Sequence, residues 1–254
     1  MYLSELSASV FNFFNSKSTI RNSKITSMIL ELSHITRFYQ TAGPETRRTV
    51  LDDVSLSIHE GDSIAITGPS GSGKSTLLNI MGTLDRPDSG SVKFQGEEIN
   101  SLTEARLALI RNRKIGFVFQ LHYLLPQLSL LENVLLPLLA HNDKSAIKQA
   151  EERALEFFKI VGLTDKFKNY PSQLSVGECQ RAAVVRALIN EPQIILADEP
   201  TGSLDHNSAK ILGELLSEIN KKYSIAIVLV THSDEIAKLA SVQYQIANGK
   251  LIKK

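Results

Sequence analysis

Residues 68–76 carry the most readable chemistry in this sequence. They run Gly-Pro-Ser-Gly-Ser-Gly-Lys-Ser-Thr and follow an apolar, β-branched run at 63–67. Glycines at these spacings let consecutive backbone N–H groups point at a phosphate, and the positive end of the following helix adds to the attraction. We expect Lys74 to reach the β- and γ-phosphates, Ser75 to ligate Mg²⁺ and Thr76 to donate near the α-phosphate. The predicted phosphate loop comprises Gly68, Pro69, Ser70, Gly71, Ser72, Gly73, Lys74, Ser75 and Thr76.

Two acids, Asp198 and Glu199, stand at the end of an apolar run at 194–197. Burying an unpaired charge is costly, so paired acids that close a buried strand are seldom structural. We expect Asp198 to hold Mg²⁺ through water, and Glu199 to polarise an attacking water as general base.

A third segment, residues 174–181, reads Leu-Ser-Val-Gly-Glu-Cys-Gln-Arg and precedes a helical stretch. Ser175 with Glu178 three residues later is a capping box, so a purely structural helix start explains the segment by itself. A capping box does not explain why this segment occurs in one chain with a phosphate loop and an acidic strand end, so the combination indicates a functional role.

The composition limits the class of protein. A chain of 254 residues suits one domain, with or without an additional lobe. Because 28 basic residues balance 27 acidic ones, no broad basic face for nucleic acid is expected. The single cysteine, Cys179, excludes a disulfide framework and suits a reducing compartment. No uninterrupted apolar run approaches the roughly 20 residues that span a bilayer, so membrane association would require a partner.

Strand and helix patterns alternate along most of the chain, which predicts an α/β fold. Such alternation builds a parallel sheet wrapped by helices, with a nucleotide at the carboxyl ends of the strands. Residues 121–190 are helical in period, so we expect them to form a lobe inserted into the α/β core.

Residues 1–27 differ from the rest because they are rich in serine and poor in acids. They lack a clear apolar stretch with a cleavage site, so a targeting segment is disfavoured. We expect these residues to be a dispensable extension, with Met28 as the real start of the protein. A disordered tail and a helix at a membrane surface are the alternatives.

Together these motifs resemble those of the ATP-binding-cassette (ABC) ATPases, over about residues 28–254. The resemblance implies a P-loop NTPase core with an antiparallel β subdomain and an inserted helical lobe, and hydrolysis of ATP with Mg²⁺. In this family two copies sandwich two ATP molecules, so a second copy of the chain is an expected partner. Ser175 and Gly177 would then contact the nucleotide that is bound to the other copy.

Further positions match the family pattern. Gln120 matches a glutamine loop that contacts Mg²⁺ or the attacking water, and His232 matches a switch histidine at the γ-phosphate. Tyr39 stands where the family stacks an aromatic ring on adenine, and residues 203–205 match a dimer-contact loop. Taken alone, Tyr39 is more often a half-buried core aromatic and His232 more often a satisfied polar residue, and Gln120 is also explained as a strand cap.

The sequence departs from the family at Val176, because the signature serine is usually followed by two glycines. An N–H remains at Val176, and the first turn of a helix has negative φ, which valine tolerates. We therefore expect Val176→Gly to keep or raise the ATPase activity.

Residues 116–126, 131–134 and 197–205 resemble the branch of lipoprotein-release and macrolide-efflux ATPases. That branch docks on integral membrane permease subunits at the cytoplasmic face of the inner membrane. We expect docking near residues 120–131, with His122, Tyr123 and Gln127 as exposed contacts, although most leucines there would simply fill the lobe. The leading hypothesis is therefore that this chain is the ATPase subunit of a lipoprotein-release transporter.

Two alternatives stay open: the ATPase of a macrolide-efflux-type exporter, and an ATP-binding regulatory scaffold like that of cell division. A DNA-repair cassette is disfavoured, because the sequence has neither a long coiled-coil insertion nor a basic face.

Overall fold

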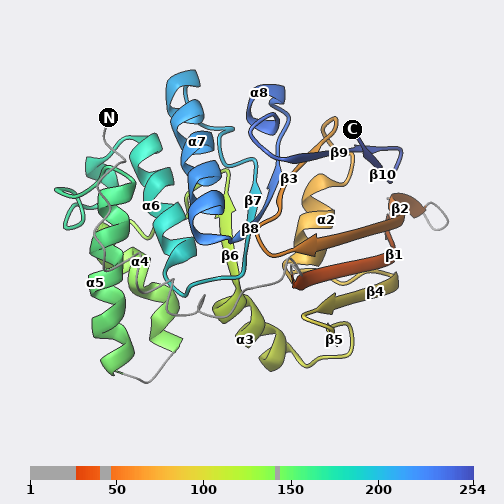
Figure 1. Ribbon diagram of the computed structural model, residues 1–254, viewed down its shortest axis with the longest axis horizontal. Coiled ribbons are helices and arrows are strands. Elements are labelled where there is room, and N and C mark those ends of the chain that lie inside the picture. The colour runs from red at the N-terminus through yellow and green to blue at the C-terminus, as the bar shows by residue number, and fades with distance from the viewer. Residues whose placement is uncertain (1–26, 41–46, 141–143) are drawn as a thin grey trace, which may run out of the picture. The chain divides into compact units, whose positions relative to one another are not determined.

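The computed structural model describes residues 27–40, 47–140 and 144–254 (Figure 1). The expected extension at 1–27 thus lies outside the described residues, apart from Ser27. The chain divides into two compact units: a core unit, residues 27–120 with 192–254, and a helical unit that includes residues 121–191. Among the described residues, no helix combines the length and apolar character that a membrane crossing needs.

The larger sheet of the core unit has six strands in the order β10-β9-β3-β8-β7-β6. The pairs β6–β7, β7–β8, β8–β3 and β3–β9 are parallel, whereas β9 and β10 form an antiparallel hairpin. All five residues of β8 are buried, as expected for a parallel strand that is covered on both faces. The strands are β3 (Ser63–Thr67), β6 (Ile115–Phe119), β7 (Ile194–Asp198), β8 (Ala226–Val230), β9 (Val242–Ala247) and β10 (Lys250–Lys253).

The register of this sheet aligns the ends of four strands. Phe119 pairs with Asp198, Asp198 with Val230, and Val230 with Ile66. The residues that follow these ends therefore leave the sheet at one edge. This places the phosphate loop, Gln120, Glu199 and His232 at the carboxyl edge, and the predicted α/β fold is confirmed.

A second, four-stranded antiparallel sheet has the order β2-β1-β4-β5. In β1 the alternation of buried residues is interrupted at His34, whose φ is 55°, and the pairing with β2 shifts there. The shift lets Leu32 and Ile35 both face the core although three positions separate them. The strands are β1 (Met28–Gln40), β2 (Arg47–His59), β4 (Ser89–Phe94) and β5 (Glu97–Glu98).

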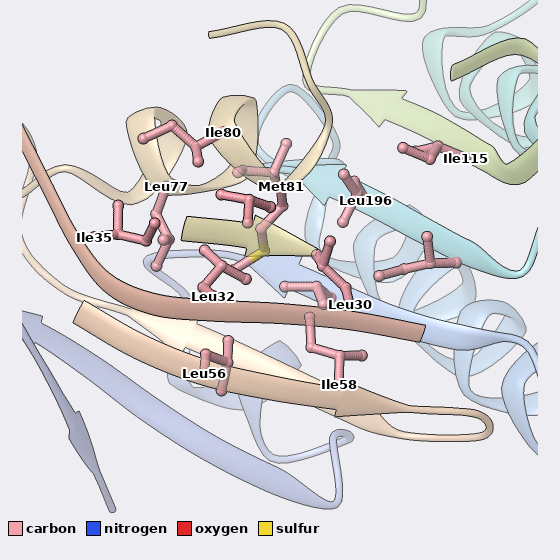
Figure 2. Packing of buried hydrophobic residues seen from close by; sticks show 14 of the residues in the cluster. Leu30, Leu32, Ile35, Leu56, Ile58, Leu77, Ile80, Met81, Ile115 and Leu196 are labelled. Carbon is pink, nitrogen blue, oxygen red and sulfur yellow. The ribbon is translucent and has the colours of Figure 1, made fainter. Parts of the chain in front are cut away.

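Helix α2 (Lys74–Met81), which follows the phosphate loop, contacts strands of both sheets and joins their cores (Figure 1). Figure 2 shows buried apolar side chains from both sheets meeting those of α2. Because α2 is held by this packing, the loop at its N-terminus is held as well. The labelled residues are Leu30, Leu32, Ile35, Leu56, Ile58, Leu77, Ile80, Met81, Ile115 and Leu196.

The remaining helices of the core unit are α3 (Glu104–Lys114), α7 (His206–Tyr223) and α8 (Asp234–Ala237). Thr103 caps α3, because its side chain accepts from the backbone N–H of Arg106. Helices α7 and α8 pack against β8 and β3, respectively.

The helical unit contains α4 (Leu130–Leu135), α5 (Lys144–Ile160) and α6 (Val176–Leu188), which contact one another. Two 3₁₀ turns, Leu136–Ala140 and Pro171–Gln173, accompany them. The expectation of helix throughout this region is wrong for residues 121–129, which form a loop, and for residues 161–170, which form turns. Asn133 is bonded to this loop: its side chain accepts from Leu125 N–H and donates to the carbonyls of Leu125, Leu128 and Ser129.

Candidate active site

The phosphate loop owes its shape to glycines, among them Gly73. Its φ is 104°, in the left-handed region, and a Cβ built there would lie 2.8 Å from the carbonyl oxygen of Val50. An L-residue would therefore be strained by the backbone and would also clash with β2. Gly73 is the N-terminal cap of α2, so the strand, loop and helix form one connected turn.

Lys74 is directed back into the loop. Its side chain is only 8% exposed, and Nζ donates to the carbonyl oxygens of Gly68 at 2.9 Å and Pro69 at 3.0 Å. Ser72 Oγ is buried and has no hydrogen-bond partner among the described residues. A phosphate would provide a stronger acceptor for the ammonium group and a partner for this hydroxyl, so the loop fits such a group.

Ser75 and Asp198 come together from α2 and the end of β7. Ser75 Oγ donates to Asp198 Oδ1 at 3.1 Å. Burial is the main cause that raises the pKa of Asp198, and Glu199 adds to it, whereas Ser75 and Lys74 act in the opposite direction. A half-buried carboxylate beside a hydroxyl offers the oxygen donors that Mg²⁺ prefers, and the ion would also relieve the cost of burial.

These two oxygens fit a Mg²⁺ ion that shares its ligands with a substrate. The described residues contain no group of three or more His, Cys, Asp or Glu side chains that could hold a metal. Mg²⁺ is usually held by one or two protein oxygens together with substrate phosphates and water.

Glu199 and His232 form the second polar pair of this edge. Glu199 Oε2 lies 2.8 Å from His232 Nδ1 and accepts the backbone N–H of His232 at 3.2 Å. The backbone of Glu199 has φ 47°, which is uncommon for a residue other than glycine. This conformation is fixed by its own N–H, which donates to Val230 O, and by its carbonyl, which accepts from Gly202. Such strain at a polar strand end is typical of functional sites.

Gln120 lies against the turn that follows Glu199. A Cβ on Gly202 would be 3.0 Å from Gln120 Nε2 and 3.3 Å from the carbonyl oxygen of Glu199. Ser203 Oγ donates to the carbonyl oxygen of Gln120 at 2.9 Å. The structure therefore brings Gln120 and Glu199 to the same turn, although 79 positions separate them in the sequence.

Tyr39 lines an open cavity of about 340 Å³ together with the phosphate loop. Its hydroxyl donates to Asp85 at 3.1 Å, and the Arg37 guanidinium lies 5.0 Å from its ring centroid. These contacts hold the ring at the rim of the cavity. The lining comprises Tyr39, Arg48, Val50, Gly71, Gly73, Lys74, Ser75 and Thr76.

Sequence reasoning missed two residues of this cavity, Arg48 and Val50. Residues 40–48 carry only the signals of a polar loop, whereas β2 already begins at Arg47. The structure places Arg48 at the cavity through the cross-strand register of the hairpin, which sets Arg48 directly opposite Tyr39.

Ser175 and Gly177 belong to the helical unit, whereas the other predicted site residues belong to the core unit. Ser175 caps α6: its Oγ accepts from Glu178 N–H at 3.3 Å, and a Glu178 carboxylate oxygen accepts from Ser175 N–H at 2.9 Å. Lys166 pairs with Glu178 and is the main cause that lowers the pKa of this carboxyl to about 2. Val176 is 51% exposed, so the valine is no part of the packed core.

Comparison with known proteins places these motifs in a family. A family described as "ABC transporter" matches residues 51–202. The lipoprotein-releasing system ATP-binding protein LolD of Bordetella avium is 47% identical over 88% of this chain and 95% of its own length. The protein of that name from Geobacter metallireducens is 44% identical over 89% of this chain and 99% of its own.

Solved structures agree in fold. The dimeric post-hydrolysis state of the ATP-binding cassette MJ0796, bound to ADP and Pi, is 38% identical with a TM-score of 0.78. It covers 89% of this chain and 98% of the MJ0796 chain. A second dimeric structure of MJ0796, described as a bacterial ABC transporter cassette, is 40% identical with a TM-score of 0.79. It covers 88% of this chain and 96% of its own.

Proposed function

This chain belongs to the ABC transporter family and is the ATPase subunit of a transporter. We propose that it powers the release of lipoproteins from the inner membrane. The observation that carries the catalytic part is the single sheet edge where Lys74, Ser75 and Asp198 meet the Glu199–His232 pair. The substrate of transport rests on the identity of 44–47% to proteins named LolD over most of the chain.

In the proposed reaction, water attacks the γ-phosphorus of ATP while the bond to the β–γ bridging oxygen breaks, which leaves ADP and phosphate. Glu199 accepts the proton of the attacking water, and His232 holds the carboxylate that does so. Gln120, on the turn of Glu199, orients the water. Lys74 balances charge on the phosphates, and Tyr39 stacks on adenine. Ser75 and Asp198 would hold Mg²⁺, which supplies charge neutralisation of the phosphates.

The proposed active form is a dimer with two sandwiched nucleotides. Support comes from the dimeric MJ0796 structures, one of which holds ADP and Pi. Ser175, Gly177 and the first N–H groups of α6 would complete the site of the partner copy, because a helix N-terminus attracts anions. Residues 203–205 would line the contact between copies.

The proposed contact with permease subunits lies near residues 120–131, which include the loop at 121–129, on the cytoplasmic face of the membrane. Leu121 and Tyr123 are 59% and 62% exposed. Arg186 donates to the carbonyl oxygens of His122 and Tyr123, both at 2.7 Å, and therefore fixes the loop that presents these side chains. A fixed apolar projection is suited to docking because little order must be gained on binding.

The catalytic assignment is tested with Glu199→Gln, which keeps the size of the side chain and removes the base. We expect ATP hydrolysis to fall by about 10²- to 10⁴-fold, the usual contribution of a general base. ATP should still bind and should hold the dimer, which size-exclusion chromatography with ATP would detect. An unchanged rate of hydrolysis would show that another group takes the proton.

The transport assignment is tested by depleting the protein in its host and fractionating the membranes. Lipoproteins destined for the outer membrane should then remain in the inner membrane. The wild-type chain should restore their release, whereas Glu199→Gln should not. Normal lipoprotein distribution after depletion would exclude this substrate and favour another exporter.

A further inference from the structure

We propose that Arg48 is a nucleotide-binding residue that recognises the polyphosphate from the β2 side of the pocket. The inference rests on the proposed ATPase function and adds a contact to it. It begins with strand pairing: Arg48 lies directly opposite Tyr39 in the antiparallel register of β1 and β2. Directly opposed residues project from the same face of a sheet, so both side chains border the same cavity.

The contacts of Arg48 lead into the phosphate loop. Its Nη2 donates to the carbonyl oxygen of Gly71 at 3.2 Å. Arg48 and Gly71 also line the cavity of about 340 Å³ that includes Tyr39, Lys74 and Thr76. One cation, Lys74, thus reaches the loop from α2, and a second, Arg48, reaches it from β2.

We expect the guanidinium of Arg48 to move from the Gly71 carbonyl to a bound polyphosphate, because the phosphate is the stronger acceptor. The Gly71 carbonyl is a neutral acceptor, whereas a phosphate group is charged and two of its oxygens can accept parallel bonds from a guanidinium. Arg48 is exposed, so its side chain can change rotamer at small cost. The contact would form with ground state and transition state alike, so it should strengthen binding without changing the rate of the chemical step.

Arg47 supplies a matched control, because it has the same charge and is the neighbouring residue of the same strand. Its guanidinium lies 4.5 Å from the ring centroid of Phe38. Successive residues of a strand point to opposite faces, so Arg47 faces away from the cavity that Arg48 borders. Loss of general positive charge should affect both variants equally, whereas loss of a specific contact should affect only Arg48.

The experiment measures equilibrium affinity with Mg²⁺ by displacing a fluorescent ADP analogue from the full-length chain. We expect Arg48→Gln to weaken ATP and ADP by about three- to tenfold, to change AMP by less than about twofold, and to leave kcat within about twofold. Arg48→Lys should recover part of the loss, because it restores charge without the guanidinium fork. Arg47→Gln should match the wild type.

The proposal would be overturned by unchanged affinity in Arg48→Gln, by equal losses in the Arg47 and Arg48 variants, or by equal losses for AMP and ATP. A lower kcat with unchanged affinity would also overturn it, because it would limit Arg48 to supporting the loop. If the wild-type chain bound no nucleotide, the proposed ATPase function would fail instead. The two failures are therefore distinguishable.

Discussion

Asn133 offers a test of what shapes the loop at 121–129. Its side chain is fully buried, and it contacts one backbone N–H and three carbonyl oxygens of residues 125–129. The amide nitrogen has only two hydrogens, so these contacts amount to about three full hydrogen bonds. At a net 0.5–1.5 kcal/mol each, Asn133→Ala should cost roughly 2–4 kcal/mol of unfolding free energy.

For a chain of this size, each kcal/mol shifts Tm by about 2–4 °C, so we expect a fall of roughly 5–15 °C. The assay is thermal unfolding followed by circular dichroism. Gln127→Ala is the matched control, because Gln127 lies in the same loop but is exposed. It should leave Tm unchanged.

Asn133→Ala also tests whether docking of permease subunits depends on a loop that is already fixed. Asn133→Ala should weaken co-purification with permease subunits well below the new Tm, because the loop is no longer fixed before docking. A Tm of Asn133→Ala within about 1 °C of the wild type would refute the idea that this side chain decides the loop structure.

The remaining predictions concern the signature, acid stability and the phosphate loop. Val176→Gly should keep or raise the ATPase rate, since Val176 is exposed and outside the core; a tenfold or greater drop would show that the valine is required. Lys166 lowers the pKa of Glu178 to about 2, so this pair adds stability that is complete above about pH 5 and is lost as the pH falls toward 2. In urea titrations, Lys166→Met should therefore lose less stability than the wild type between pH 6 and pH 3, and equal losses would contradict the pairing. Gly73→Ala should weaken ATP binding at least about tenfold because of the clash with Val50, whereas Gly96→Ala, with φ 81° but nothing within 4 Å of a built Cβ, should not.

Local sequence was sufficient for the phosphate loop, the acidic strand end and the α/β fold. The glycine spacing specifies a tight turn, and apolar β-branched runs specify buried parallel strands. Once those strands are parallel, their carboxyl ends must share an edge, so residues such as Ser75 and Asp198 were predictable as neighbours. They are 123 positions apart, and their oxygens lie 3.1 Å apart.

Tertiary structure alone decided the features whose partners are set by pairing and packing. Arg48 borders the cavity because the register of β1 and β2 sets it opposite Tyr39, and no local signal encodes a register. Residues 121–129 show helical leucine spacing, yet one buried amide at Asn133 satisfies backbone groups that a helix would otherwise use. The left-handed backbone of Glu199 depends on bonds from β8 and Gly202. Periodicity therefore predicted most elements and their order, whereas strand register and side-chain hydrogen bonds determined the exact positions of the side chains.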